Sequence, residues 1–295
     1  MDGDRIRELL SSSPVLMPGV WDALSARMGM GAGHAVLFLS GYAAAATLLG
    51  LPDFGYLTQA EMAEVARRVC GRVPEAAVVV DADTGHGNAL NTIRTVELFE
   101  AAGAAGIFLE DQVWPKKCGH IAGKRVVPTE EWLAKLRAAL DHRRRLFVVA
   151  RTDARAAGGL HDAIERAQAA AALGVDAVFV EAPESVAEME AVAAATPGVV
   201  RVANMIEAGR TPLLTPAQLH DLGYDLVVSP LTGLFAAARA LSETYAVLRA
   251  KGSLRDDLAL VTTFDAFNQI VRLDDHYELE LRYPEADGPS PLPAS

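Results

Sequence analysis

The 295-residue sequence is poor in cysteine, in aromatic residues and in positive charge. Its two cysteines, Cys70 and Cys118, cannot build a disulfide framework, so a reducing cytoplasm suits the chain. The net charge of −11 argues against partners such as nucleic acid or an anionic membrane, because both need a basic surface. A small anionic substrate would therefore need a local cationic pocket.

Long apolar runs and a recognisable targeting segment are also missing. The amino terminus lacks the basic-then-apolar order of a signal peptide, and no stretch is long enough to cross a bilayer. We therefore expect a cytoplasmic protein without a membrane partner. No predicted strand is followed by the Gly-x-Gly-x-x-Gly pattern of a dinucleotide-binding fold, which disfavours a doubly wound open sheet, the competing architecture.

Short β-branched runs alternate with helical patterns along most of the chain, and this alternation predicts a parallel α/β fold. Eight such units favour a (β/α)8 TIM barrel over residues 1–252 as the catalytic domain. Residues 253–283 would add a C-terminal helical extension, and residues 284–295 a disordered Pro/Ser-rich tail. The predicted strands are Val15–Pro18, Val36–Ser40, Ala77–Asp81, Gly106–Glu110, Leu146–Arg151, Ala177–Glu181, Val199–Asn204 and Leu226–Ser229.

The predicted strands have apolar interiors but polar or charged carboxyl ends. A closed barrel gathers these ends into one ring, where the active sites of such barrels lie. Burial alone would not place polar residues at seven strand ends, so we predict a catalytic mouth. The residues at these ends are Ser40, Asp81, Asp83, Glu110, Asp111, Arg151, Asp153, Glu181, Asn204 and Ser229.

Asp81 and Asp83 are the strongest metal signal in the chain. Carboxylates two positions apart on a strand point the same way, so both can face one ion. Hard oxygen donors without a neighbouring cysteine favour Mg²⁺, with Mn²⁺ as the alternative, over structural zinc. The competing interpretation is a cluster of Asx turns that caps a helix at Asn91. Glu110 adds a third acid at the adjacent strand end.

A loop after the strand Gly106–Glu110 combines two lysines, a thiol and an imidazole in the run 116–120. Cationic neighbours lower the pKa of a thiol, so Cys118 is a candidate proton donor or acceptor near neutral pH. Gly119 supplies backbone freedom. A solvated loop with an incidental cysteine is the alternative.

Arg151 is the best candidate for gripping a substrate carboxylate, because a guanidinium group matches a carboxylate bidentately. An arginine that merely balances Glu181 or Glu110 is the other interpretation, and the two roles are compatible. The pair Ser40-Gly41 offers backbone N–H groups to a ligand carboxylate, or else forms a simple turn.

These segments resemble the isocitrate lyase/phosphoenolpyruvate mutase superfamily, closest to its 2-methylisocitrate lyase-like and carboxyphosphonoenolpyruvate phosphonomutase-like members. Matching motifs recur in order, as Asp-Ala-Leu-Ser-Ala at 22–26, Ser-Gly at 40–41, Asp-x-Asp-x-Gly at 81–85, Lys-Lys-Cys-Gly-His at 116–120 and Asn-x-x-Glu at 204–207. His86 departs from the pattern, because the family usually has an aromatic residue there. The chain lacks the Asn-x-Ser-Pro-Ser-type motif of isocitrate lyases proper, so isocitrate is not the expected substrate.

The resemblance implies roles for individual residues. Lys116, His120, Arg151, Glu110 and Cys118 would be catalytic, with Cys118 as the proton donor. A metal shell would comprise Asp81, Asp83, Glu110 and, through water, Asp53. Residues implied to bind the substrate are Ser40, Gly41, Tyr42, Gly119, Arg151, Glu181, Asn204 and Thr232, with specificity set by side chains such as Tyr42, His86 and Thr232.

Together these features predict a Mg²⁺-dependent lyase that cleaves a C–C bond in a small 2-hydroxy di- or tricarboxylic acid, 2-methylisocitrate-like, by retro-aldol chemistry. The alternatives are a carboxyphosphonoenolpyruvate phosphonomutase that forms a C–P bond, an oxaloacetate hydrolase or decarboxylase, and a barrel that only binds its ligand. The resemblance also implies a homo-oligomer, a dimer or homotetramer, assembled through the terminal helices.

Overall fold

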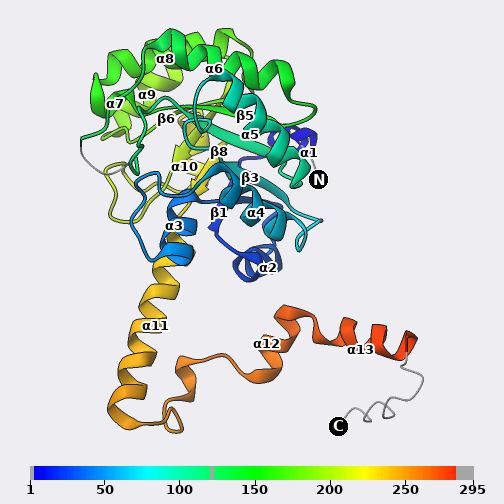
Figure 1. Ribbon diagram of the computed structural model, residues 1–295. Helices are drawn as coiled ribbons and strands as arrows, with labels where there is room; N and C mark the ends of the chain where they lie inside the picture. Colours follow the sequence, from blue (N-terminus) through cyan, green and yellow to red (C-terminus); the bar gives the residue numbers. More distant parts are fainter. Residues whose placement is uncertain (1–2, 120–122, 284–295) are drawn as a thin grey trace. The chain divides into compact units, whose positions relative to one another are not determined.

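The computed structural model describes residues 3–119 and 123–283 (Figure 1). Eight parallel strands close into a barrel in the order β1 to β8, so the predicted TIM barrel is confirmed and the open sheet is excluded. The bounds of the strands lie within two residues of the predicted ones. They are β1 Val15–Val20, β2 Val36–Leu39, β3 Ala77–Asp81, β4 Gly106–Glu110, β5 Phe147–Thr152, β6 Ala177–Val180, β7 Val200–Asn204 and β8 Leu226–Ser229.

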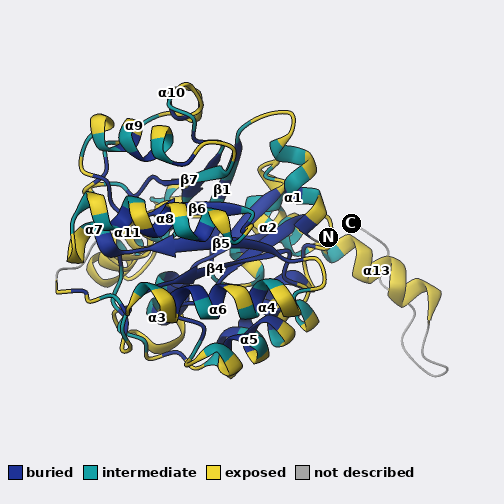
Figure 2. Cartoon of the chain, turned by 90° about the horizontal axis from the view of Figure 1, so that it is seen from above, coloured by how far each residue is buried: buried dark blue, intermediate teal, exposed yellow. Residues whose placement is uncertain are grey.

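Helices follow the strands and cover the outside of the barrel. Seen from above, the strands are buried, whereas the outward faces of α4, α5, α6 and α8 are exposed (Figure 2). The helices are α1 Gly3–Leu10, α2 Ala23–Gly31, α3 Gly41–Leu49, α4 Gln59–Cys70, α5 Ala89–Ala101, α6 Thr129–His142, α7 Ala154–Ala157, α8 Leu160–Ala172, α9 Val186–Ala195, α10 Pro216–Asp221, α11 Thr232–Lys251, α12 Phe264–Val271 and α13 Leu273–Arg282, with a 3-10 turn η1 at Leu258–Leu260.

The barrel divides its core into two layers, because successive side chains of a strand point to opposite faces. On β8, Val228 belongs to the cluster inside the barrel, whereas Val227 belongs to the cluster between the barrel and its helices. The same alternation decides which residue at each strand end faces the mouth. Local signals fix the helix starts, as at α4, where Thr58 and Glu61 form a capping box.

The chain separates into two compact units, Met1–Ala236 and Ala237–Ser295, so the division falls inside α11 and earlier than the predicted domain boundary at residue 252. No residue of α11, α12 or α13 is buried. The predicted tail at 284–295 lies outside the described residues. Within the described ranges, no helix is both long and apolar enough to span a membrane.

Candidate active site

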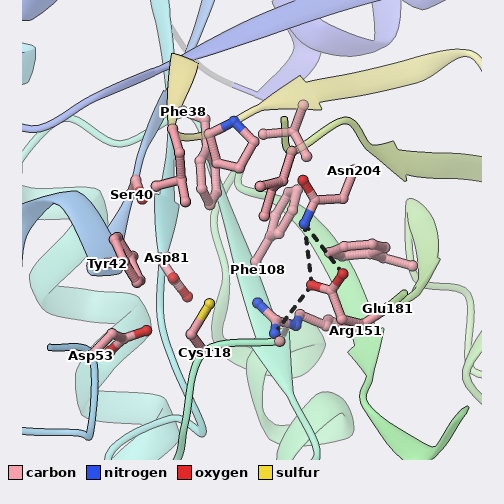
Figure 3. A pocket seen from close by; sticks show the side chains of 16 residues that line it. Phe38, Ser40, Tyr42, Asp53, Asp81, Phe108, Cys118, Arg151, Glu181 and Asn204 are labelled. Carbon is pink, nitrogen blue, oxygen red and sulfur yellow. Dashed lines mark hydrogen bonds and ion pairs between the residues drawn. The ribbon is translucent and has the colours of Figure 1, made fainter. Parts of the chain in front are cut away.

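A cavity opens at the carboxyl ends of the strands in the first unit (Figure 3). Its lining includes nine of the residues that we predicted to be catalytic or to bind metal or substrate, and they lie at the ends of the six strands β2 to β7 or in the segments that follow them. These nine are Ser40, Tyr42, Asp53, Asp81, Cys118, Gly119, Arg151, Glu181 and Asn204. The barrel mouth is therefore the candidate active site, as the polar strand ends predicted.

Four buried carboxylates, those of Asp53, Asp81, Asp83 and Glu110, form what we call the acid cluster. Lys116 joins two of them, because its Nζ atom lies 2.7 Å from an oxygen of Asp53 and 2.7 Å from Asp83 Oδ1. A Cβ atom on Gly41 would lie 2.9 Å from Asp81 Oδ2 and 3.5 Å from Asp83 Oδ1. Only glycine at position 41 therefore leaves room for both carboxylates.

The alternative interpretation, a cluster of Asx turns that caps a helix at Asn91, is present in part, because Asp83 N donates a hydrogen bond to Asp81 Oδ1 at 3.2 Å and a cap follows at the start of α5. Asn88 caps α5, since its side chain accepts hydrogen bonds from Leu90 N and Asn91 N. Asp81 also lines the cavity, whereas Asp83 is buried next to Lys116 and is not part of the cavity lining. A cap and an acid pair thus lie side by side in the same segment.

Arg151 lies on the cavity and contacts three acids. Its guanidinium nitrogens are 3.4 Å from Glu110, 3.2 Å from Glu181 and 3.0 Å from Asp153. Burial lowers the pKa of Arg151, but these acids outweigh burial and raise it well above its ordinary value. Arg151 is thus a permanent cation, placed both to balance its neighbours and to face a ligand.

Burial dominates the electrostatics of the acid cluster. It raises the pKa of Asp83 to about 7, with Lys116 acting in the opposite direction, and it raises the pKa of Glu110 well above its ordinary value. For Lys116, burial lowers the pKa, but Asp83 and Asp53 reverse the effect and raise it well above normal. A buried group of carboxylates that resists ionisation favours binding of an additional cation.

The acid cluster fits a divalent metal ion by its chemistry. All four members supply carboxylate oxygens, which Mg²⁺ and Mn²⁺ prefer, and Glu110 Oε1 is buried without a hydrogen-bond partner. Within the described part of the chain, no three His, Cys, Asp or Glu side chains are already arranged as direct ligands. The cluster therefore fits an ion that keeps several of its waters, as Mg²⁺ usually does.

The loop after β4 carries Cys118 into the cavity, where its sulfur points between Asp81 and Arg151 (Figure 3). The amide of Cys118 donates a hydrogen bond to Asp53 O at 3.3 Å. The side chain of Gln112 binds both backbone groups of Lys117, the residue before Cys118. It donates a hydrogen bond to Lys117 O at 2.7 Å and accepts one from Lys117 N at 3.0 Å. The thiol is thus fixed beside the acid cluster.

Gly119 packs directly on Glu181, because a Cβ atom at position 119 would lie 2.5 Å from Glu181 Oε2. Lys124 donates a hydrogen bond to Gly119 O and forms an ion pair with Asp153 at 2.9 Å. Our sequence reasoning did not identify Lys124 as part of the site. The predicted catalytic residue His120 lies outside the described residues.

Other predicted residues lie at or beyond the edge of the cavity. Ser40 caps α3 with its side chain and Gly41 begins that helix. Thr232 is exposed and donates a hydrogen bond to Glu207 instead of lining the cavity. Lys116 does not line the cavity either, because its side chain is buried among the carboxylates of the acid cluster.

His86 does not line the cavity. Its Nδ1 atom lies 3.1 Å from Thr95 Oγ1, and its ring meets Phe99 edge-on at a centroid distance of 6.1 Å. Burial lowers the pKa of His86 to about 4, so the ring is neutral near neutral pH. The structure places His86 against Thr95 and Phe99 of α5, outside the cavity lining.

Seven apolar residues of the cavity escaped our sequence reasoning, although a signal for three of them exists. Phe38, Phe108 and Phe179 each precede a polar strand-end residue by two positions, and residues two apart share a face of a strand. They therefore lie one layer below the mouth, inside the barrel. The other four come from the segments after β7 and within or after β8, and they are Ile206, Val228, Pro230 and Leu231.

A family model described as phosphoenolpyruvate phosphomutase matches residues 6–249. A carboxyvinyl-carboxyphosphonate phosphorylmutase of Arabidopsis thaliana is 52% identical over 91% of this chain and 80% of its own length. A 2,3-dimethylmalate lyase of Eubacterium barkeri is 41% identical over 95% and 97% of the two chains. A 2-methylisocitrate lyase of Halalkalibacterium halodurans is 38% identical over 94% and 92%.

Solved structures with the same architecture carry related names. Oxaloacetate acetylhydrolase in complex with 3,3-difluorooxalacetate superimposes with a TM-score of 0.91 at 31% identity, covering 97% of this chain and 98% of that one. Phosphonopyruvate hydrolase in complex with oxalate and Mg²⁺ superimposes with a TM-score of 0.86 at 27% identity, covering 97% and 100%. The names of these similar proteins thus mention carboxylic acids, phosphonates and, in one structure, magnesium.

Proposed function

Because this chain belongs to the phosphoenolpyruvate mutase family of the isocitrate lyase/phosphoenolpyruvate mutase superfamily, we propose that it is a divalent-cation-dependent lyase that cleaves a C–C bond in a small 2-hydroxy carboxylic acid. The supporting observation is the position of the Cys118 thiol, which lines one cavity together with Asp81 and Arg151. A bond-cleaving site of this kind needs an oxygen-donor set, a fixed cation and a proton donor within reach of one ligand.

The acid cluster would hold a divalent ion, which would supply Lewis acidity toward the hydroxyl oxygen of the substrate. Arg151 binds a substrate carboxylate and holds it against the floor of the cavity. The hydroxyl proton passes to a carboxylate of the acid cluster, and the C–O bond becomes a carbonyl as the adjacent C–C bond breaks. The electron pair of that bond stays on the departing carbon as a carboxylate-stabilised carbanion.

Cys118 then delivers a proton to this carbanion, so that the products are an oxo acid and a second carboxylic acid. Lys116 and Arg151 are the described cations close enough to the acid cluster to offset the charge that develops. The loop that carries Cys118 is held by Gln112 on one side and Lys124 on the other, and so limits the access of water to the carbanion. His120 belongs to the same loop and stays a prediction.

A phosphonomutase that forms a C–P bond is the second candidate. The names of the relatives support it better than cleavage of 2-methylisocitrate, because the relative named for the mutase is 52% identical and the one named for the lyase 38%. A hydrolase of oxaloacetate is the third, given the superposition on oxaloacetate acetylhydrolase. All three reactions need the same cationic environment for a developing enolate.

Product analysis separates these candidates. The purified protein is incubated with Mg²⁺ and, in turn, a 2-hydroxy dicarboxylate, oxaloacetate and a carboxyphosphonate ester of enolpyruvate. Proton and phosphorus NMR identify the products, with EDTA as the control. The lyase predicts an oxo acid and a carboxylate in equal amounts that disappear with EDTA. A new phosphonate signal, or oxalate from oxaloacetate alone, would contradict it.

We also propose that the C-terminal unit joins copies of the chain into a homo-oligomer. Its helices have no buried residue, and α12 presents Phe264 with 81% of its surface exposed. Exposed apolar side chains on helices that bury none of their residues mark an interaction surface. Sedimentation of Phe264→Glu beside the wild-type chain tests this, since loss of the larger species is expected and unchanged mass would contradict it. The cytoplasmic location stays a prediction.

A further inference from the structure

A second cavity lies outside the barrel mouth and shares no lining residue with the candidate active site. We call it the outer cavity. It encloses about 720 Å³, a volume typical of sites that hold small organic ligands. Its walls come from the segment before α4, the segment after β3, both arms of the loop between β4 and α6 (residues 112–114 and 126–128), and α6 itself.

Lys135 of α6 brings a buried ammonium group to the outer cavity. Its side chain is 6% exposed, and it is the one lysine or arginine among the described residues of the lining. An ammonium group has three N–H donors. Within the described residues, however, Lys135 Nζ has only two partners, Thr84 O at 3.3 Å and Glu131 Oε1 at 3.7 Å. Burial lowers the pKa of Lys135 although Glu131 opposes it, so an anion at Nζ would supply missing compensation.

His86 brings a second unsatisfied group to the same space. Its Nδ1 atom lies 3.1 Å from Thr95 Oγ1, whereas its Nε2 atom is buried without a hydrogen-bond partner. The neutral ring can donate or accept at Nε2, according to its tautomer. A buried nitrogen without a partner is unfavourable, and a polar atom of a ligand in the outer cavity can satisfy it.

Aromatic and aliphatic side chains surround these polar groups. Tyr56 and Trp114 line the outer cavity with 53% and 46% of their surface exposed. The ring of Trp114 packs on Gly55, where a Cβ atom would lie 2.8 Å from the ring, so its position is fixed despite its exposure. A flat apolar ligand can stack on such rings. The aliphatic part of the lining consists of Leu57, Val113, Val126, Val127 and Pro128.

Glu131 limits the charge of an occupant. Its carboxylate lies near the Lys135 ammonium and is 53% exposed, so it balances that ammonium only in part. A ligand with one negative charge gains the attraction of Lys135. A second negative charge on the ligand would meet the Glu131 carboxylate and be repelled. The di- and tricarboxylic acids that suit the barrel mouth are therefore poor ligands for the outer cavity.

The outer cavity borders the loop that carries Cys118. Gln112 lines the cavity, is 1% exposed, and binds both backbone groups of Lys117 with its side chain. Gln112 and Val126 also pair across the two arms of the loop in an antiparallel bridge, and both line the outer cavity. A ligand that contacts both arms favours their paired arrangement. Its binding therefore restrains the segment 112–118.

We propose that the outer cavity is a regulatory site for an organic acid with one carboxylate and a flat apolar body, whose binding restrains the segment 112–118. The carboxylate is expected at Lys135 Nζ, a polar atom at His86 Nε2 and the flat body against Trp114. This site goes beyond the proposed function, because its ligand is neither substrate nor product. An effect on the reaction would reach Cys118 through Gln112.

Titration calorimetry with 1-naphthoate tests binding to the full chain. Mg²⁺ and oxalate are present throughout, so that a small anion already competes for the barrel mouth. We expect one bound 1-naphthoate per chain. The neutral 1-naphthamide should bind at least about tenfold more weakly, because it loses the charge-assisted hydrogen bond to Lys135. Acetate, which lacks the flat body, should show no measurable binding.

Two variants of α6 provide a matched comparison. Lys135→Met removes the buried ammonium, whereas Arg137→Met removes an exposed cation from the same helix. We expect at least about tenfold weaker binding of 1-naphthoate by Lys135→Met and wild-type binding by Arg137→Met. Trp114→Ala, a change at a half-exposed position, should weaken binding as well. Equal affinity of Lys135→Met and Arg137→Met for 1-naphthoate would overturn the site.

Alkylation of Cys118 by iodoacetamide measures the restraint without any turnover. We expect 1-naphthoate at about ten times its Kd to slow alkylation at least about twofold in the wild-type chain but not in Lys135→Met. Cys118→Ser, in which only the buried Cys70 remains, gives the background rate. Unchanged alkylation with 1-naphthoate bound would overturn the regulatory role, and no binding would overturn the site. Neither measurement needs a cleaved substrate, so both outcomes are distinct from failure of the proposed function.

Discussion

The two sides of the barrel mouth are built from the same alternation of strand residues but by opposite chemistry. From β3 to β6 the strand ends supply Asp81, Glu110, Arg151 and Glu181. From β7 to β8 they supply Asn204 and four buried apolar residues of the cavity lining, which we call the apolar wall: Ile206, Val228, Pro230 and Leu231. The buried charges of the first side are stabilised by mutual ion pairs, whereas the side chains of the apolar wall are held by close packing alone. We therefore expect substitutions on the charged side to affect the chemical step and substitutions on the apolar wall to affect mainly the packing around the ligand.

Removing Arg151 should have the largest effect on the charged side. Arg151→Ala leaves Glu110 and Glu181 buried without their shared cation, which costs about 3–5 kcal/mol of folding free energy. Loss of the guanidinium group that binds the substrate carboxylate should lower kcat/KM by roughly 10³-fold or more, because the substrate is no longer held in a fixed orientation. Urea unfolding and steady-state kinetics measure the two effects. Arg155→Ala, which breaks a more exposed ion pair with Glu188, is the control and should keep full activity.

Cys118→Ser should lower kcat by about 10²–10⁴-fold, because a serine hydroxyl at the same place is a poor acid. The thiol is only partly buried, so the midpoint of thermal unfolding should change little. Cys70→Ser is the matched control, since Cys70 lies on α4 in the core and affects stability alone. Unchanged turnover of Cys118→Ser would remove the thiol from the mechanism.

The pH dependence of the folding stability should reveal the cost of ionising Asp83 in the buried acid cluster. The pKa of Asp83 is about 7 in the folded chain, against an ordinary value of 3.8, so without metal the folded state holds a proton that the unfolded state releases. Stability should therefore fall as pH rises from about 4 to about 7, by a few kcal/mol. Asp83→Asn should show a shallower fall. Parallel profiles of the two proteins in chemical unfolding would contradict this account.

The smallest effect is expected on the apolar wall. Ile206→Val removes one methylene from a side chain that is 8% exposed, and such a change costs about 0.5–1.5 kcal/mol. Because Ile206 contacts no reacting atom in our account, kcat on the best substrate should change less than about twofold, while KM rises. A large fall in kcat would show that the two sides of the mouth are not separable.

The sequence predicted the charged side of the mouth better than the apolar side. Polar residues at strand ends stand out against apolar interiors, so Asp81, Glu110 and Arg151 could be recognised and placed in one ring. Wall residues such as Leu231 resemble core residues in every local pattern, and only the closed barrel shows which of them meet free space. The pairing of Lys116 with Asp53, 63 positions apart, likewise follows from the folded loop.

The position of His86 shows how a departure from a family pattern can mislead. A titrating group in the motif 81–88 suggested a polar addition to the mouth, yet the ring turns toward Thr95 and Phe99. The backbone at His86 has a positive φ of 60°, which few residues other than glycine adopt. Such a turn cannot be foreseen from residue type alone.

Titration calorimetry of Mg²⁺, with oxalate present as a substrate-like anion, tests the central claim most directly. The account predicts one Mg²⁺ site per wild-type chain, at least about tenfold weaker binding by Asp83→Asn, and unchanged binding by the wall variant Ile206→Val. Equal Mg²⁺ affinity in the wild-type chain and Asp83→Asn, or no Mg²⁺ binding at all, would contradict it.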